Sequence, residues 1–190
     1  MQIAQDTVAE RKSADSQAAG TGAATSPEAD RTLAARPWAV LRILLGAVFL
    51  WAFLDKTFGL GFATPPEKAW IAGGSPTAGY LGSMKGSLAS AFQALAGAPI
   101  VDWAFMVGLL CIGTALVLGI ALRAAAVGGT ALMALMWLSS LPLKSNPVID
   151  EHVVYAAAMI ALAASHAGDT WGLARPWTAL TATPALRWLR

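Results

Sequence analysis

The sequence predicts an all-α integral membrane protein, a four-helix bundle with a long extracytoplasmic linker between helices 1 and 2 and a disordered N-terminal tail. Of its 190 residues, 56% are hydrophobic and 13% are charged, whereas soluble domains carry about 25% charged residues. The mean hydropathy is +0.57. Four apolar segments each approach the ~20 residues that cross a bilayer core. A soluble fold could not bury this much apolar surface, so we expect the lipid bilayer to surround the chain.

The apolar segments divide the chain into three regions. Residues 1–36 are rich in Ala, Ser, Thr and Gly, carry mixed charges and lack apolar periodicity, which predicts a disordered cytoplasmic tail. Residues 37–173 form the predicted four-helix domain, and residues 174–190 a cytoplasmic C-terminal segment. The second and third spans follow each other almost directly, so they must form an antiparallel hairpin. The predicted spans are residues 38–57, 103–122, 124–143 and 148–167.

Basic residues near the span ends predict the orientation of the bundle. In a four-span arrangement one side carries Lys56, Lys68, Lys85 and Lys144. The other side carries Arg31, Arg36, Arg123, Arg175, Arg187 and Arg190. The richer side is predicted to be cytoplasmic, because cytoplasmic loops carry an excess of basic residues. Both termini are therefore expected in the cytoplasm and the long linker outside.

The linker, about residues 59–101, begins with glycines and prolines and turns at Gly73-Gly74-Ser75-Pro76-Thr77. Apolar residues then recur at three- and four-residue spacing. This pattern predicts an amphipathic helix over Gly82–Ala96 that lies on the bundle. Surface packing and a gating role are both consistent with it.

A polar cluster at the start of the fourth span is the main candidate for a functional site. Asn146 is predicted to cap this helix and Pro147 to occupy its first position. Asp150, Glu151 and His152 then lie near the positive end of the helix dipole, which favours negative charge. Helical spacing places Glu151 and His152 on one face with Tyr155 and Met159, and Asp150 on another. Helix capping and chemistry are both open interpretations of this cluster.

Arg42 and Lys56 are the notable cations of the first span. They share a face with Phe49, because the three residues are seven apart. Lys56 is expected at the outer mouth with Asp55 and the Asp150–His152 cluster, and Arg42 near the inner side. A structural role and a role in binding remain open for both.

Several classes of function lack the residues they need. Cys111 is the only cysteine, so no disulfide, zinc or iron–sulfur ligand set is expected. His152 and His166 are 14 residues apart on one predicted helix, ~21 Å by rise, so they cannot ligate one haem. No metal is expected. No glycine pattern typical of nucleotide binding follows a strand, and the charges are too scattered for nucleic acid.

The ordered set of motifs resembles the DoxX/DoxD membrane proteins, and in particular the DoxD-type subunit of thiosulfate:quinone oxidoreductase. The resemblance covers about residues 37–173. It implies a four-helix bundle in a bacterial plasma membrane, and an enzyme that oxidises thiosulfate to tetrathionate and passes the electrons to quinone. The matching residues are Leu41-Arg42, Gly46, Phe49, Lys56-x-x-Gly59, Trp70–Leu81, Gly113–Arg123 and Asn146-Pro147-x-x-Asp150-Glu151-His152-x-x-Tyr155.

With this resemblance, the predicted function is that of a membrane subunit of a quinone-linked oxidoreductase. Quinone is expected at the outer mouth, hydrogen-bonded by His152 and Tyr155, with Arg42 as a further quinone-binding residue. Asp150 or Glu151 would exchange protons, and Lys56 would attract the anionic donor or stabilise reduced quinone. Histidine suits proton exchange because its ordinary pKa is ~6.5.

Two other classes of function remain open. In the first, the chain is a non-catalytic membrane anchor or accessory subunit of a respiratory or redox complex, with a partner protein that does the chemistry. In the second, it transports a small solute. A transporter predicts charge deep in several spans, and only Arg42 approaches this.

Overall fold

The computed structural model describes residues 27–143 and 146–183, with side chains from residue 33 onward. These residues form α-helices and two 3-10 helices and contain no strand, so the all-α prediction is confirmed. The chain divides into two units, Met1–Ala34 and Ala35–Arg190. The helices are α2 (Pro27–Phe58), α3 (Ala78–Gly82), α4 (Ala89–Gln93), α5 (Pro99–Leu118), α6 (Leu122–Ser139), α7 (Glu151–Ala164) and α8 (Ala174–Leu180), with η1 (Pro66–Lys68) and η2 (Trp70–Ala72).

Part of the predicted disordered tail is helical. Helix α2 begins at Pro27, so residues 27–36 are helical. Proline is common at the first position of a helix, which favours a helix start here. Residues 1–26 lie outside the described part of the chain.

Three helices of the described residues are long and apolar enough to cross a membrane: Leu33–Phe58 within α2, Pro99–Leu118 and Leu122–Ser139. Their length and composition are those of a membrane protein. Helix α7 is apolar but has 14 residues, ~21 Å by rise against a core of ~30 Å. The fourth predicted span, residues 148–167, is therefore observed as a shorter helix.

Local signals move the ends of the spans by about one turn from their predicted places. Helix α5 starts at Pro99 instead of residue 103 and ends at Leu118 instead of residue 122. Gly119 follows it with a φ of 70°, a conformation common after a helix C-terminus. Helix α6 ends at Ser139 instead of residue 143, because Pro142 lies just beyond it. Residues 119–121 join the two helices, which confirms the predicted hairpin.

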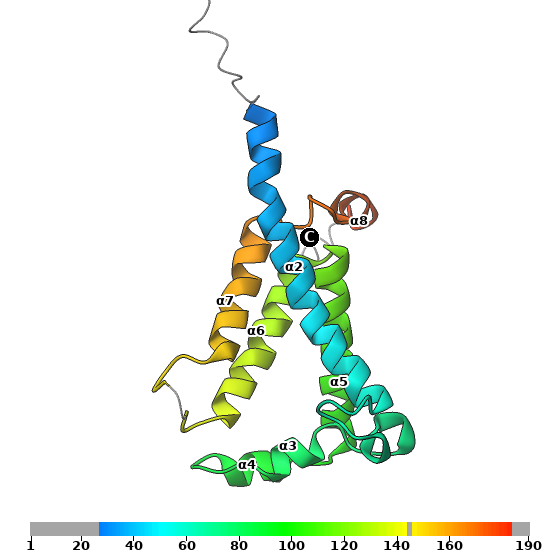
Figure 1. The fold of residues 1–190 in the computed structure, drawn as a ribbon, viewed down its shortest axis with the longest axis vertical. Helices are drawn as coiled ribbons and strands as arrows, with labels where there is room; N and C mark the ends of the chain where they lie inside the picture. The colour runs from blue at the N-terminus through cyan, green and yellow to red at the C-terminus, as the bar shows by residue number, and fades with distance from the viewer. Residues whose placement is uncertain (1–26, 144–145, 184–190) are drawn as a thin grey trace, which may run out of the picture. The chain divides into compact units, whose positions relative to one another are not determined.

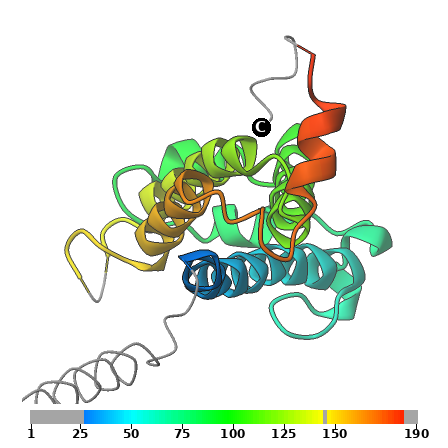
Figure 2. The same ribbon diagram turned by 90° about the horizontal axis from the view of Figure 1, so that it is seen from above.

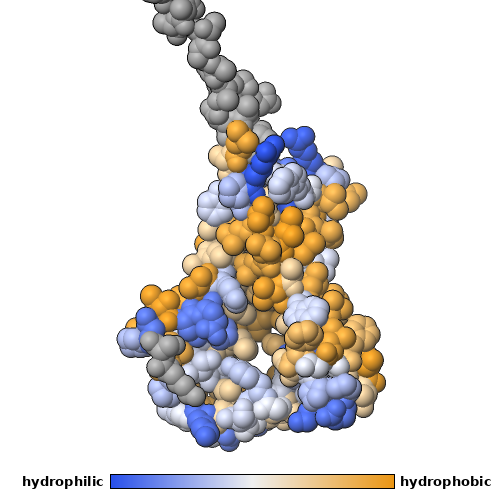
Figure 3. Space-filling view, in the orientation of Figure 1, coloured by the Kyte–Doolittle hydropathy of each residue, from blue (hydrophilic) through white to orange (hydrophobic). Residues whose placement is uncertain are grey.

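In the second unit, α2 lies along one side of α5, α6 and α7 (Figures 1 and 2). Glycines permit the closest approaches. A Cβ added at Gly46 of α2 would lie 2.8 Å from Val117, and one at Gly129 of α6 would lie 2.3 Å from the sulfur of Met159 in α7. The core cluster draws its buried side chains from all four helices, including Phe49, Met106, Met133 and Met159. Apolar residues dominate the middle of this surface and polar residues gather toward its ends (Figure 3).

Arg42 joins α2 to two other segments. Its side chain is completely buried. Its guanidinium donates to the carbonyl oxygens of Leu116 and Val117 in the last turn of α5 and of Ala167, Thr170 and Trp171 after α7. A cation is favoured at a helix C-terminus, where carbonyls lack helical partners. These hydrogen bonds satisfy a charge that would otherwise be costly inside an apolar bundle.

Two buried carboxylates hold the linker against the bundle. Asp55, in the last turn of α2, accepts hydrogen bonds from the backbone N–H groups of Phe62 at 3.3 Å and Ala63 at 3.1 Å. Asp102, in the first turn of α5, accepts from the Ser75 hydroxyl at 2.9 Å and from the N–H and hydroxyl of Thr77. The segment from α2 to α3 is therefore tied at both ends.

The amphipathic helix predicted over Gly82–Ala96 is wrong in extent. The linker forms two short helices, α3 and α4, which lie crosswise at one end of the unit (Figure 1). Gly86, between them, has a φ of 105°, and a Cβ there would lie 2.6 Å from the Leu141 carbonyl oxygen. A continuous helix would not permit this conformation, which brings the linker against the end of α6.

We expect Arg42→Met to destabilise the bundle by at least about 3 kcal/mol, because buried carbonyls would lose charged donors. Thermal unfolding in one detergent would measure this against Arg36→Met, which removes an exposed arginine from the same helix. Equal melting temperatures for the two variants would contradict the structural role of Arg42.

Candidate functional site

The polar cluster at the start of α7 forms a connected unit. Asp150 is the N-cap residue, and its side chain accepts hydrogen bonds from the backbone N–H groups of His152 at 3.0 Å and Val153 at 3.3 Å. Its other carboxylate oxygen lies 2.8 Å from Nδ1 of His152. The two side chains are 9% and 15% exposed. They form a carboxylate–imidazole pair at the rim of the bundle.

Two sequence expectations for this region are wrong. Asn146 does not cap α7; its side-chain oxygen accepts from Val148 and Ile149 at 2.9 Å each and forms a turn before the helix. Asp150 caps the helix instead, since a carboxylate is a strong acceptor for the free N–H groups there. Because an N-cap residue is extended, Asp150 leaves the helical path and reaches the His152 ring, although helical spacing placed it on another face.

The cluster has the donor atoms for a metal ion. Asp150, Glu151 and His152 each offer one ligand atom, and these atoms lie within 4.8 Å of one another. Glu151 is exposed, and the His152 Nδ1 atom already bonds Asp150. The observed contacts of Asp150 are the helix cap and the bond to the His152 ring.

Hydrogen bonding sets the ionisation of Asp150. Burial by itself raises the pKa of this carboxyl, but the bonds from the His152 ring and from the N–H groups of Val153 and His152, with the attraction of His152, outweigh it. The pKa of Asp150 is therefore held below its ordinary value of 3.8. Asp150 is the ionised acceptor of the pair near neutral pH.

The other predicted residues have contacts of their own. All the N–H groups of Arg42 are directed at backbone carbonyls, so the quinone-binding role predicted for it has no donor to act through. Lys56 lies at the end of α2 with its amine 5.9 Å from the centroid of the Phe105 ring. Tyr155 is half-buried and packs against the core cluster.

The sequence did not reveal an apolar groove between α5 and α6. Its volume is about 750 Å³, and Figure 3 shows a hollow toward the end of the unit that carries the linker. Helices α3 and α4, Leu95 after α4 and Ala121 in the α5–α6 link contribute its remaining lining. Polar lining side chains are few among the described residues, and they include Tyr80 and Ser139.

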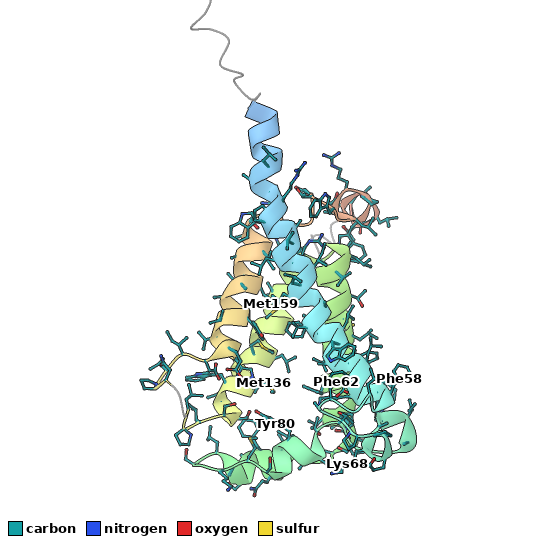
Figure 4. The ribbon with its side chains drawn as sticks, in the orientation of Figure 1. Phe58, Phe62, Lys68, Tyr80, Met136 and Met159 are labelled. Carbon is teal, nitrogen blue, oxygen red and sulfur yellow. The ribbon has the colours of Figure 1, made fainter. Side chains whose placement is uncertain are left out.

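Tyr80 and Ser139 meet at one end of the groove. Their hydroxyl oxygens are 2.8 Å apart, and the Ser140 hydroxyl lies 3.4 Å from that of Tyr80. Tyr80 belongs to α3 and lies near the end of α6 that carries Met136 (Figure 4). Phe105, the ring beneath Lys56, also lines the groove. The three- and four-residue spacing of apolar residues in the linker could not predict the contact between Tyr80 and Ser139. This contact depends on the linker crossing to α6.

The Asp150–His152 pair lies at the same end of the unit. Helix α7 begins beside the end of α6, where Nε1 of Trp137 donates to the carbonyl oxygen of Val148 at 2.9 Å. Neither His152 nor Tyr155 lines the groove. The structure thus offers a hydroxyl pair in the groove lining. It also offers a carboxylate–imidazole pair at the start of α7, the end of that helix nearer to α3 and α4 (Figure 1).

Comparison with protein families, with curated proteins and with solved structures found no match to this chain. The resemblance drawn from its motifs therefore stays a hypothesis.

We expect the start of α7 to lose protection in acid. Because the folded-state pKa of Asp150 lies below 3.8, its bonds stabilise the folded protein fully above that pH and are lost as the pH falls through the folded value. The protection factors of the His152 and Val153 amides against hydrogen exchange should therefore fall in this pH range.

Two variants check the cause. Asp150→Asn should keep the cap and abolish the pH dependence, whereas Asp150→Ala should cost about 1 kcal/mol. Glu151→Gln, which alters the neighbouring acid, should retain the acid-dependent exchange. A pH profile that persists in Asp150→Asn would assign the transition to another group.

Proposed function

We propose that this chain is the membrane subunit of a quinone-linked oxidoreductase and that the groove between α5 and α6 binds the quinone. The observation that carries the proposal is an apolar cavity of about 750 Å³ with the hydroxyls of Tyr80 and Ser139 at one end. Ligand sites typically combine apolar walls with a few convergent polar groups, in volumes of roughly 300–1,000 Å³. A quinone has this pattern, with carbonyl oxygens on an apolar body.

The proposed arrangement in the membrane rests on the distribution of basic residues and on the resemblance to the DoxX/DoxD proteins. Helix α7, with the residues that flank it, completes a four-helix bundle of the DoxX/DoxD type in a bacterial plasma membrane. Both termini lie in the cytoplasm, and the linker lies outside over the end of the groove. The fully buried Arg42 lets α2 keep a charge near the inner side, because carbonyl oxygens surround the guanidinium.

Thiosulfate is the proposed electron donor, on the strength of the resemblance to the DoxD-type subunit. Two thiosulfate ions each lose one electron and join through a new sulfur–sulfur bond to form tetrathionate. The quinone gains both electrons and takes up two protons to become the quinol. The chain's residues bind and orient: the hydroxyls of Tyr80 and Ser139 hydrogen-bond a quinone carbonyl.

Charged groups at the same end suit the remaining steps. The Asp150–His152 pair would deliver protons, since histidine is the most common general acid and base in enzymes and the ring already bonds a carboxylate. Glu151, exposed beside it, would take up protons from solvent. Lys56 would attract the anionic donor, because its amine has no hydrogen-bond partner among the described residues and lies over a ring of the groove wall.

A non-catalytic accessory subunit is the second candidate. The observation that favours it is that three deeply buried ionisable side chains, Arg42, Asp55 and Asp102, all bind backbone or hydroxyl groups of this chain. They serve the fold and leave the chemistry to a partner protein. In this case the groove would hold lipid or quinone without turnover.

Thiosulfate-dependent quinone reduction by the purified full chain tests the proposal. His152→Ala and Lys56→Ala should each lower turnover by roughly a hundredfold, the size expected when a proton-transfer or charge-binding group is lost. Tyr80→Phe should mainly raise the KM for quinone, because it removes a hydrogen bond to the carbonyl.

The chain offers matched controls for these variants. His166→Asn changes a histidine outside the cluster and keeps a residue that tolerates its φ of 53°. Lys85→Ala removes an exposed lysine of the linker. Both should retain activity. Absence of turnover from well-folded protein, together with copurification of one stoichiometric partner, would contradict the enzyme and favour the accessory subunit.

A further inference from the structure

The two helices that form the walls of the groove pack closely on their other neighbours but not on each other. Helices α5 and α6 pack closely on their other neighbours: a Cβ at Gly113 of α5 would lie 2.8 Å from Leu50 of α2, and one at Gly129 of α6 would lie 2.3 Å from Met159 of α7. A Cβ at Gly108 of α5 or at Gly128 of α6 would meet nothing within 4 Å. Both of these glycines line the groove. The faces that α5 and α6 turn toward the groove are therefore open, although the helices are joined by a short link.

The composition of the groove decides what can fill it. Its walls between the two helices carry mostly small apolar residues such as Ala104, Ala115, Ala124 and Ala131. Water needs several polar partners to be stable in a cavity, and these walls offer none over most of their length. An empty space of this size would forfeit the dispersion contacts that close packing supplies. A hydrocarbon chain satisfies both conditions.

Polar groups at one end of the groove indicate the headgroup of the ligand. The hydroxyls of Tyr80 and Ser139 lie 2.8 Å apart, so one oxygen-bearing headgroup can accept or donate a hydrogen bond there. Ala104, Cys111 and Gly128 are exposed along the groove, which leaves it accessible from the side that lipid would cover. The pattern is that of a single-chain amphiphile with an uncharged oxygen headgroup.

We propose that the groove binds such an amphiphile along its whole length, with the head at Tyr80 and Ser139 and the chain between Gly108 and Gly128. Under the proposed function, on which the identity of the head rests, the ligand is a quinone that bears a long apolar chain. Short quinones without a chain then bind much more weakly. The acyl chain of a membrane lipid is the other source of the same chemistry.

Cys111 provides a native reporter, because it is the only cysteine of the chain and lines the groove. The full chain in nanodiscs is alkylated with N-ethylmaleimide, and intact mass spectrometry follows the rate. A long-chain quinone and farnesol, which has a chain and a hydroxyl but no redox group, should both slow alkylation by roughly tenfold, the equivalent of ~1.4 kcal/mol of binding preference. Duroquinone, which has no chain, should leave the rate unchanged.

Side chains placed at the open glycines test the path of the chain. Gly108→Leu and Gly128→Leu fill open space, so the fold should persist while protection by the long-chain ligands disappears. Val107→Leu adds bulk at a neighbouring position of α5 that does not line the groove, and it should retain protection. Crosslinking with a diazirine-bearing alkyl quinone gives a second readout, in which labels should map to α5 and α6.

The outcomes separate this inference from the proposed function. Ligand protection that vanishes in Gly108→Leu supports the inference even if thiosulfate gives no turnover. Turnover in Gly108→Leu with an unchanged KM for long-chain quinone overturns the inference but is consistent with the proposed enzymatic function. Crosslinks confined to other helices, or equal protection by duroquinone, also overturn it. Alkylation that is already slow in phospholipid and fast in short-chain detergent, with no effect of quinone, assigns the groove to lipid and overturns the quinone ligand.

Discussion

The five carbonyl oxygens around Arg42 are the constraint on which the second unit depends. A guanidinium has its donors in one plane, so it can join the end of α5 to the turn after α7 from a single position on α2. The approach is close enough that a Cβ at Gly119 would lie 2.8 Å from Nη1 of Arg42. The desolvated charge is compensated only while all three segments stay together, which couples their positions to one another.

The contacts of Arg42 lie at the end of the unit far from the linker. The end that carries the linker is held by other contacts. There Asp55 and Asp102 hold the chain between α2 and α3, and the hydroxyls of Tyr80 and Ser139 join α3 to the end of α6. Helices α5 and α6 share a short link near Arg42, and the linker contributes to the groove at their other ends. One end is thus fixed by a buried charge, and the other is closed by hydrogen bonds around an apolar cavity.

The candidate site illustrates how local chemistry and long-range contact contribute separately. Asp150 and His152 are two residues apart, so their pairing needs only the extended backbone of an N-cap. Tyr80 and Ser139 are 59 residues apart and meet only because Gly86 lets the linker approach Leu141. The first pair is therefore visible as a cluster in the sequence, and the second pair is not. Arg42 was also assigned to a ligand, because a buried arginine and a binding arginine look alike in one dimension.

By itself the sequence determined the helical class, three of the four spans that it predicted, the α5–α6 hairpin and the polar start of α7. Each of these follows from apolar run length, from a short link or from capping chemistry within a few residues. The tertiary structure alone decided which carbonyls surround Arg42, how the linker breaks into α3 and α4, and that α5 and α6 leave a groove between them. These features depend on residues far apart in the chain, whose approach is set by packing and by the need to satisfy buried polar groups.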